Sequence, residues 1–183
     1  MFRIINIFEI FSDYFKTMKE DLNLVPFLVI LVGIPLVIAY FLSCLVSNDF
    51  FNEFVKNLII INTILIPLLI NVLMILYYSV ERTKALPESK EKNTKIQFLR
   101  HLHLTLTMST LVSTIILIIS VLLDVTAINF KEFQAYYQFF SYNVANVWPI
   151  KMVVFFLIGF LFINILIVIK RIYLLINYEI KVE

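Results

Sequence analysis

The sequence contains few of the residues on which most catalytic and metal sites depend. Only two of its 183 residues are glycine, Gly33 and Gly159, so a glycine-rich loop for a phosphate or a dinucleotide is excluded. The single cysteine, Cys44, excludes an intrachain disulfide and a cysteine-based metal cage. Charged residues make up only 15% of the chain and the net charge is +2, whereas soluble domains carry about 25% charged residues. We therefore expect no direct nucleic-acid binding.

Hydrophobic residues, in contrast, make up 61% of the chain, against about 45–50% in a typical soluble domain. They are concentrated in four stretches without a charged side chain: 22–48, 57–80, 101–123 and 152–169. A helix needs roughly 20 apolar residues to cross a hydrocarbon core of about 30 Å, and residues 148–150 lengthen the fourth stretch. The sequence thus predicts an all-α integral membrane protein, folded as a four-transmembrane-helix bundle.

The segment boundaries follow from these stretches and from the polar residues between them. The outer segment before the fourth span is rich in aromatic rings, which concentrate at membrane–water boundaries. Its amides make it too polar for a lipid-exposed span, and the sequence leaves open whether it is re-entrant or surface-lying. Within a single membrane domain, 1–183, we expect an N-terminal helix at 1–21, spans at 23–47, 56–80, 102–124 and 148–178 (the last with a cytoplasmic extension), a cytoplasmic loop or helix at 81–100 and the outer segment at 125–147.

The orientation follows from the distribution of lysine and arginine near the span ends, because cytoplasmic loops carry an excess of both. Twelve of the 15 basic residues lie in the N-terminal segment, the central loop and the C-terminal tail. The other three are Lys56, Lys131 and Lys151. We therefore expect both termini and the central loop in the cytoplasm. No signal-peptide cleavage site is expected after the first apolar run.

Residues 2–18 have helical periodicity. Ile7, Phe11, Tyr14 and Met18 share one side of a helical wheel, and Asp13 lies on the opposite side. Such a separation of apolar and polar faces, next to a span, predicts an amphipathic helix in the cytoplasmic interface. The alternative is that its apolar face packs on a partner subunit or on the central loop.

The sequence indicates no catalysis, proton-coupled transport or metal binding inside the membrane. No Asp, Glu, Lys or Arg lies in the middle of any predicted span, although proton-coupled transporters mark their pathways with such residues. The sequence has no Ser–His–Asp pattern, no paired carboxylates at membrane depth and no HExxH. His101 and His103 are two residues apart, so they point to different sides of a helix. We expect no enzyme, no cofactor and no metal site.

Neutral polar residues predict contacts between the spans. Small and hydroxyl residues on one helix face allow close packing and hydrogen bonding in lipid. Buried amides at Asn62, Asn71 and Asn164 need partners, because an unpaired amide in hydrocarbon is costly. The third span carries a face of hydroxyls, interpreted as a helix-packing surface or as the lining of a water-filled pathway in a homo-oligomer: Thr105, Ser109, Ser113 and Ser120.

The central loop is the main hydrophilic block of the chain. Its mixed charges are typical of a solvated helix face. They also suit a docking site for a soluble cytoplasmic protein or for anionic lipid headgroups. The basic candidates for this docking are Arg82, Lys84, Lys90, Lys92, Lys95 and Arg100.

The whole chain resembles, by its architecture, small four-span membrane components of bacterial anti-phage systems. Examples are the KwaA subunit of Kiwa systems and the membrane accessory of type VI-B CRISPR systems. The resemblance is carried by the short cytoplasmic lead-in (1–21), the four spans, the basic central loop (82–100) and the tail at Lys170 and Arg171. It implies an oligomer in the bacterial inner membrane that recruits or regulates a soluble effector. The alternatives are a channel or membrane-permeabilising effector and a bacteriocin immunity protein.

Overall fold

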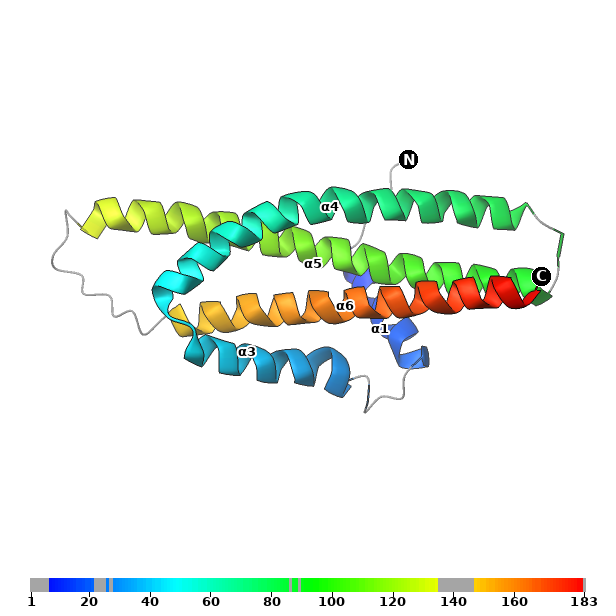
Figure 1. Ribbon diagram of the computed structural model, residues 1–183, viewed down its shortest axis with the longest axis horizontal. Helices are drawn as coiled ribbons and strands as arrows, with labels where there is room; N and C mark the ends of the chain where they lie inside the picture. The colour runs from blue at the N-terminus through cyan, green and yellow to red at the C-terminus, as the bar shows by residue number, and fades with distance from the viewer. Residues whose placement is uncertain are drawn as a thin grey trace.

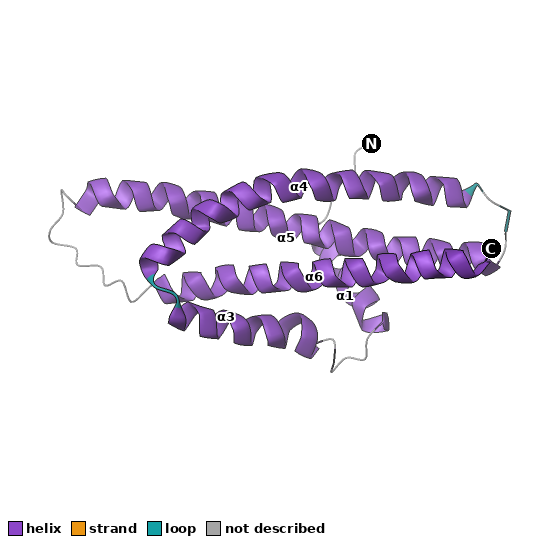
Figure 2. Cartoon of the chain, viewed as in Figure 1, coloured by secondary structure: helices purple, strands orange, loops and turns teal. Residues whose placement is uncertain are grey.

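The computed structural model describes residues 7–21, 26, 28–85, 87–88, 90–134 and 147–182. These residues are almost entirely helical and contain no strand (Figure 2). The helices, in chain order (Figure 1), are α1 (Ile7–Asp21), the π-helical turn η1 (Val29–Gly33), α3 (Ile34–Leu45), α4 (Asn48–Lys84), α5 (Lys90–Gln134) and α6 (Val147–Val182).

Three helices are long and apolar enough to cross a membrane: α4 over Asn48–Lys84, α5 over Lys92–Val125 and α6 over Trp148–Asn177. The predicted all-α membrane class is confirmed at this level, and the chain is a helical membrane protein. The first predicted span, 23–47, corresponds to a shorter apolar helix over Val29–Leu45. Most of the residues between this helix and α1 lie outside the described part of the chain.

The three long helices are longer than a bilayer core is thick. They contain 37, 45 and 36 residues, which at about 1.5 Å per residue is roughly 54–68 Å, against about 30 Å of hydrocarbon. We call the end at which α4 ends, α5 begins and α6 ends the turn end, and the opposite end the far end. Figure 1 shows α4, α5 and α6 extending past α1 toward the turn end.

The helices pack in the order α3, α6, α5, α4, and α1 crosses behind α5 and α6 (Figure 1). The buried side of α3 consists of Pro35, Ala39 and Ser43, which repeat every four residues and so share one helix face. Gly159 of α6 lies opposite this face. A Cβ added there would be 3.2 Å from the Cβ of Pro35, so the glycine lets the two helices approach closely.

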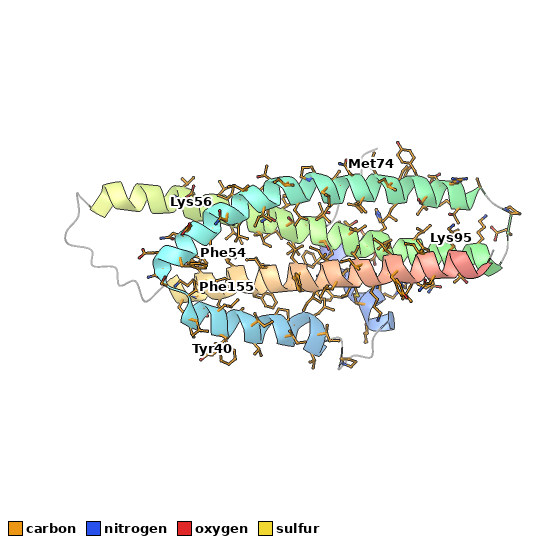
Figure 3. All side chains as sticks on the ribbon, in the orientation of Figure 1. Tyr40, Phe54, Lys56, Met74, Lys95 and Phe155 are labelled. Atoms are coloured by element: carbon orange, nitrogen blue, oxygen red, sulfur yellow. The ribbon has the colours of Figure 1, made fainter. Side chains whose placement is uncertain are left out.

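The core has two parts along the length of the molecule. The larger cluster lies toward the far end and includes Phe51 of α4, Met108 of α5 and Phe155 of α6. Figure 3 labels Phe155 and its neighbour Phe54, whose ring centroids lie 5.6 Å apart. The smaller cluster lies toward the turn end. Outside both, α4 exposes large apolar side chains along its length, as a lipid-facing helix does; examples are Ile60, Ile64, Met74 and Ile75.

The connection between α3 and α4 is short and held by polar contacts. Val46 is extended, and the Ser47 side chain accepts a hydrogen bond from the backbone N–H of Phe50, which caps the start of α4. Lys151 is 5% exposed, and its ammonium donates to the Val46 carbonyl oxygen at 2.7 Å. It also lies 5.8 Å from the centroid of the Phe51 ring. A cation at a helix C-terminus is electrostatically favourable, so α6 fixes the end of α3.

Two predicted segments differ from the observed helices. The predicted loop or helix at 81–100 is divided between the end of α4 and the start of α5, with only residues 85–89 between them. The predicted outer segment at 125–147 overlaps α5, which continues to Gln134, and α6, which begins at Val147. Residues 135–146 lie outside the described part.

Candidate functional site

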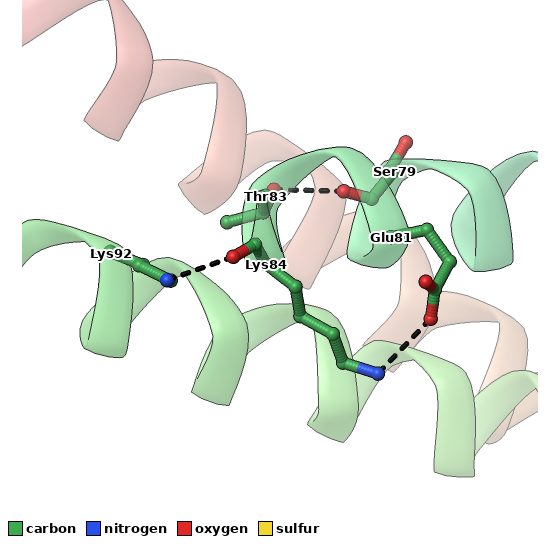
Figure 4. Close-up of polar contacts among 5 residues, drawn as sticks. All are labelled: Ser79, Glu81, Thr83, Lys84 and Lys92. Carbon is green, nitrogen blue, oxygen red and sulfur yellow. Dashed lines mark hydrogen bonds and ion pairs between the residues drawn. The ribbon is translucent and has the colours of Figure 1, made fainter. Parts of the chain in front are cut away.

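Contacts of two lysines stabilise the turn between α4 and α5 (Figure 4). The Lys92 ammonium donates to the Lys84 carbonyl oxygen at 2.9 Å (Figure 4). It also donates to the Glu88 carboxylate at 3.3 Å. The Lys84 ammonium pairs with Glu81 at 3.1 Å. Lys92 therefore satisfies a carbonyl at the end of α4, where helix carbonyls lack intrahelical donors. Its side chain is only 9% exposed, so Lys92 stabilises the turn and presents little surface to a partner.

A cavity of about 520 Å³ opens between α4, α5 and α6 next to this turn. Its cations are Arg82 of α4, which is exposed, and Lys95 of α5, which is half-buried. Figure 3 labels Lys95 near the turn end. The remaining lining residues are apolar or carry a hydroxyl: Leu76, Ser79, Thr83, Leu99 and Leu175.

A second groove of about 340 Å³ lies between α1 and α5. Lys16 of α1 and Arg100 of α5 line it, and both are exposed. Its walls also include the carboxylate of Asp13 and the imidazole of His101. It therefore carries both signs of charge.

The six basic residues predicted to form one docking site thus lie in different surroundings. Lys84 and Lys92 hold the turn, Arg82 and Lys95 line the cavity, and Arg100 lines the groove. Lys90 is the first residue of α5, and its side chain lies outside the described part. These residues lie close together in the sequence. On α4 and α5, however, the described ones point to different places: the turn, the cavity or the groove.

Arg171 is a buried cation that sequence reasoning assigned to the C-terminal tail. It is 7% exposed. Its guanidinium donates to the His101 carbonyl oxygen at 2.5 Å and to the Thr105 hydroxyl, and contacts the Met18 sulfur at 3.5 Å. These contacts join α1, α5 and α6. A signal was present in the sequence, because Arg171 is seven residues from Asn164 and so shares its helix face.

Tyr14 connects α1 to the middle of α6. Its hydroxyl is buried and donates to the side-chain carbonyl oxygen of Asn164 at 2.5 Å, while the side-chain amide N–H of Asn164 donates to the Phe160 backbone carbonyl oxygen at 2.8 Å. Burial raises the pKa of the Tyr14 hydroxyl well above its ordinary value of 10.0, although the Arg171 charge and the Asn164 hydrogen bond act in the opposite direction. The Asn164 amide was expected to need a partner. That partner is the hydroxyl of Tyr14 in α1, outside the predicted spans.

The predicted hydroxyl face of α5 lies inside a single chain. Thr105, Ser109, Ser113 and Ser120 have 0% exposure. The Ser113 hydroxyl donates to the side-chain carbonyl oxygen of Asn62 at 2.5 Å, which joins α5 to α4. In this arrangement the four side chains lie at helix contacts, and a path through an oligomer would require these helices to separate.

Two further polar residues of the predicted set differ in their surroundings. Asn71 is exposed on α4, so the expectation of a buried amide is wrong at this position, because that side of α4 faces outward. The Ser120 hydroxyl is buried and has no hydrogen-bond partner among the described residues.

The cavity between α4, α5 and α6 and the groove between α1 and α5 are the candidate binding surfaces. Among the described residues, no group of three His, Cys, Asp or Glu side chains is placed to hold a metal ion. His101 is half-buried and His103 is exposed. Comparison with known protein families, with curated proteins and with solved structures finds no match to this chain.

Proposed function

We propose that this protein is a membrane scaffold that recruits or regulates a soluble cytoplasmic protein through its turn end. The observation that carries the proposal is the length of α4, α5 and α6, which exceeds the bilayer core and leaves helical turns with basic side chains outside it. A soluble partner needs such a protruding surface, because most of the exposed side chains of α4 within its uncharged stretch, 57–80, are apolar.

In this proposal the chain crosses the inner membrane four times, with the N- and C-termini and the turn end in the cytoplasm. The short helix over Val29–Leu45 is the first span. The excess of basic residues in the predicted cytoplasmic segments supports the orientation. Homo-oligomerisation through the exposed apolar surface of α4 is part of the same proposal. The narrower role, a component of a bacterial anti-phage defence system, rests on the architectural resemblance given above.

The test uses the full chain in detergent or nanodiscs and the soluble protein encoded by the neighbouring gene. Charge reversal of Arg82, Lys95 and Arg100 together is expected to abolish co-purification and, in cells, to abolish any reduction in phage plating. Lys84 and Lys92 are left unchanged because they hold the turn. The matched control is Lys56→Glu, an exposed lysine toward the far end (Figure 3), which should retain the partner.

Unchanged partner binding by the triple variant would overturn docking at the turn end. Protection of cells against one bacteriocin, with no effect on phage plating, would replace the defence role by an immunity role.

A further inference from the structure

The outer side of α4 carries an amide at membrane depth. α4 stands at the end of the helix order α3, α6, α5, α4 (Figure 1), and Asn71 is exposed on its outer side. Asn71 lies ten residues before Glu81, the first charged residue after the stretch 57–80, which is about 15 Å along a helix. Half of a hydrocarbon core is also about 15 Å. With Glu81 at the edge of the core, Asn71 lies near the middle of the bilayer.

The other two amides predicted to need partners use both of their polar groups inside the chain. The side-chain N–H of Asn62 donates to its own helix, and its side-chain carbonyl oxygen accepts from Ser113. Asn164 bonds in the same way to its own helix and to Tyr14. Among the described residues, none forms a hydrogen bond with the Asn71 side chain. An unpaired amide is costly where lipid tails offer no hydrogen-bonding group, so Asn71 favours another protein over lipid as its neighbour.

Asn71 belongs to a row of exposed residues on α4, which we call the outer stripe. Its members recur at alternating intervals of three and four residues, so they stay within about 100° of the helix surface. They lie on the side opposite to Asn62, which bonds α5. This spacing is the seam of two helices that cross at a small left-handed angle, the usual crossing between helices in membranes. The outer stripe consists of Asn71 and five apolar residues that are 54–67% exposed: Ile61, Ile64, Leu68, Ile75 and Tyr78.

We propose that the outer stripe binds the outer stripe of a second copy of this chain, with the two Asn71 amides hydrogen-bonded to each other. Copies inserted in one membrane have the same orientation, so their α4 helices are parallel and the same residues meet across a twofold axis. An asparagine suits this position because its amide has both a donor and an acceptor. The stripe gives the homo-oligomer of the proposed function, on which this inference rests, a defined contact.

Cross-linking tests which face of α4 meets the second copy. The full chain is purified in a Cys44→Ala background, reconstituted in liposomes and oxidised with copper phenanthroline. Leu68→Cys should form a disulfide-linked dimer, because a disulfide needs Cβ atoms about 3.5–4.5 Å apart. The matched control is Ile70→Cys, which is also exposed and lies at nearly the same depth. Two residues along a helix turn it about 200° away from Leu68, so it should form little dimer.

Energy transfer between labelled copies in liposomes tests the amide. Asn71→Leu should lower the association constant by about three- to thirtyfold, the usual effect of an interhelical hydrogen bond in lipid. The control is Thr63→Val, another exposed polar residue of α4. The Thr63 hydroxyl donates to the Ile59 carbonyl oxygen of its own helix at 2.7 Å and lies outside the outer stripe, so this variant should associate as the wild type does. Both substituted residues are exposed, and unchanged unfolding temperatures verify that the fold is kept.

Three outcomes would overturn the proposal: equal cross-linking at positions 68 and 70, wild-type association of Asn71→Leu, or a chain that stays monomeric at every protein-to-lipid ratio. The first two would leave an oligomer formed through another face, whereas the third would also remove the oligomer from the proposed function. Docking at the turn end is measured separately with the soluble partner. Its failure would leave the contact between the outer stripes intact.

Discussion

At the scale of single residues, several buried polar groups among the described residues are paired across helices. Tyr14 of α1 bonds Asn164 of α6, and Ser113 of α5 bonds Asn62 of α4. Arg171 of α6 bonds two groups of α5. Leaving such groups unpaired in an apolar interior is costly, so each pair favours one relative position of its two helices.

Tyr14→Phe should destabilise the fold, because it removes the hydroxyl and leaves the side-chain carbonyl oxygen of Asn164 without this donor. The expected loss is about 1–3 kcal/mol in the free energy of unfolding, measured by denaturant titration in detergent at pH 8. A phenylalanine variant as stable as the wild type would show that this buried hydrogen bond contributes nothing.

The same substitution tests the pH dependence. The folded pKa of Tyr14 is raised above the ordinary value of 10.0, so the neutral hydroxyl is favoured by folding. Its contribution is complete below pH 10 and is lost as the pH rises above 10 toward the folded pKa. The stability difference between wild type and Tyr14→Phe should therefore be constant from pH 7 to 9 and shrink above pH 10. A difference that is unchanged up to pH 11 would contradict the burial of this hydroxyl.

At the scale of helices, the contact between α3 and α6 depends on a missing side chain. Gly159 faces Pro35, and an added Cβ would lie 3.3 Å from the proline Cα. The backbone of α3 therefore has little room to give way. Gly33 differs, because an added Cβ there would meet only the Leu28 carbonyl oxygen at 3.8 Å.

Gly159→Leu should destabilise the protein by about 1–3 kcal/mol, the usual cost of overpacking, by pushing α3 away from α6. Gly33→Ala is the matched control and should have little effect or stabilise slightly, since alanine favours helices. Thermal unfolding in detergent measures both variants. Equal unfolding temperatures for the two variants would show that α3 and α6 are not closely packed at Gly159.

At the scale of the whole molecule, the long helices must extend out of the bilayer on at least one side. The basic residues at the turn end predict that this side is cytoplasmic. At the far end, Lys151 bonds a helix carbonyl and Lys56 is exposed on α4.

Cysteine labelling tests this orientation. In a Cys44→Ala background, Lys84→Cys should react with a membrane-impermeant maleimide only after the cells are permeabilised. Lys56→Cys should react in intact spheroplasts. Both lysines are exposed, so the two sites differ mainly in the side of the membrane. The opposite labelling pattern would invert the topology and remove the basis for a cytoplasmic partner at the turn end.

Part of the candidate site was predictable from the sequence. The charge-free stretches predict the apolar helices, and Ser113 and Asn62 were both expected to make contacts between helices. The buried position of Arg171 was not predicted, because the basic pair at 170–171 has the composition of a membrane-flanking tail. Only the helical phase, which places Lys170 outward and Arg171 inward, separates the two.

The sequence by itself determined that this chain is a helical membrane protein, because backbone polar groups in lipid must be satisfied within helices and long charge-free runs have no other stable environment. The tertiary structure decided which side chains meet. It placed α1 against α5 and α6, buried Arg171, and divided the basic residues of the loop between the turn, a cavity and a groove. The physical reason is that contacts between helices depend on which faces are covered, and residues far apart in sequence supply those faces.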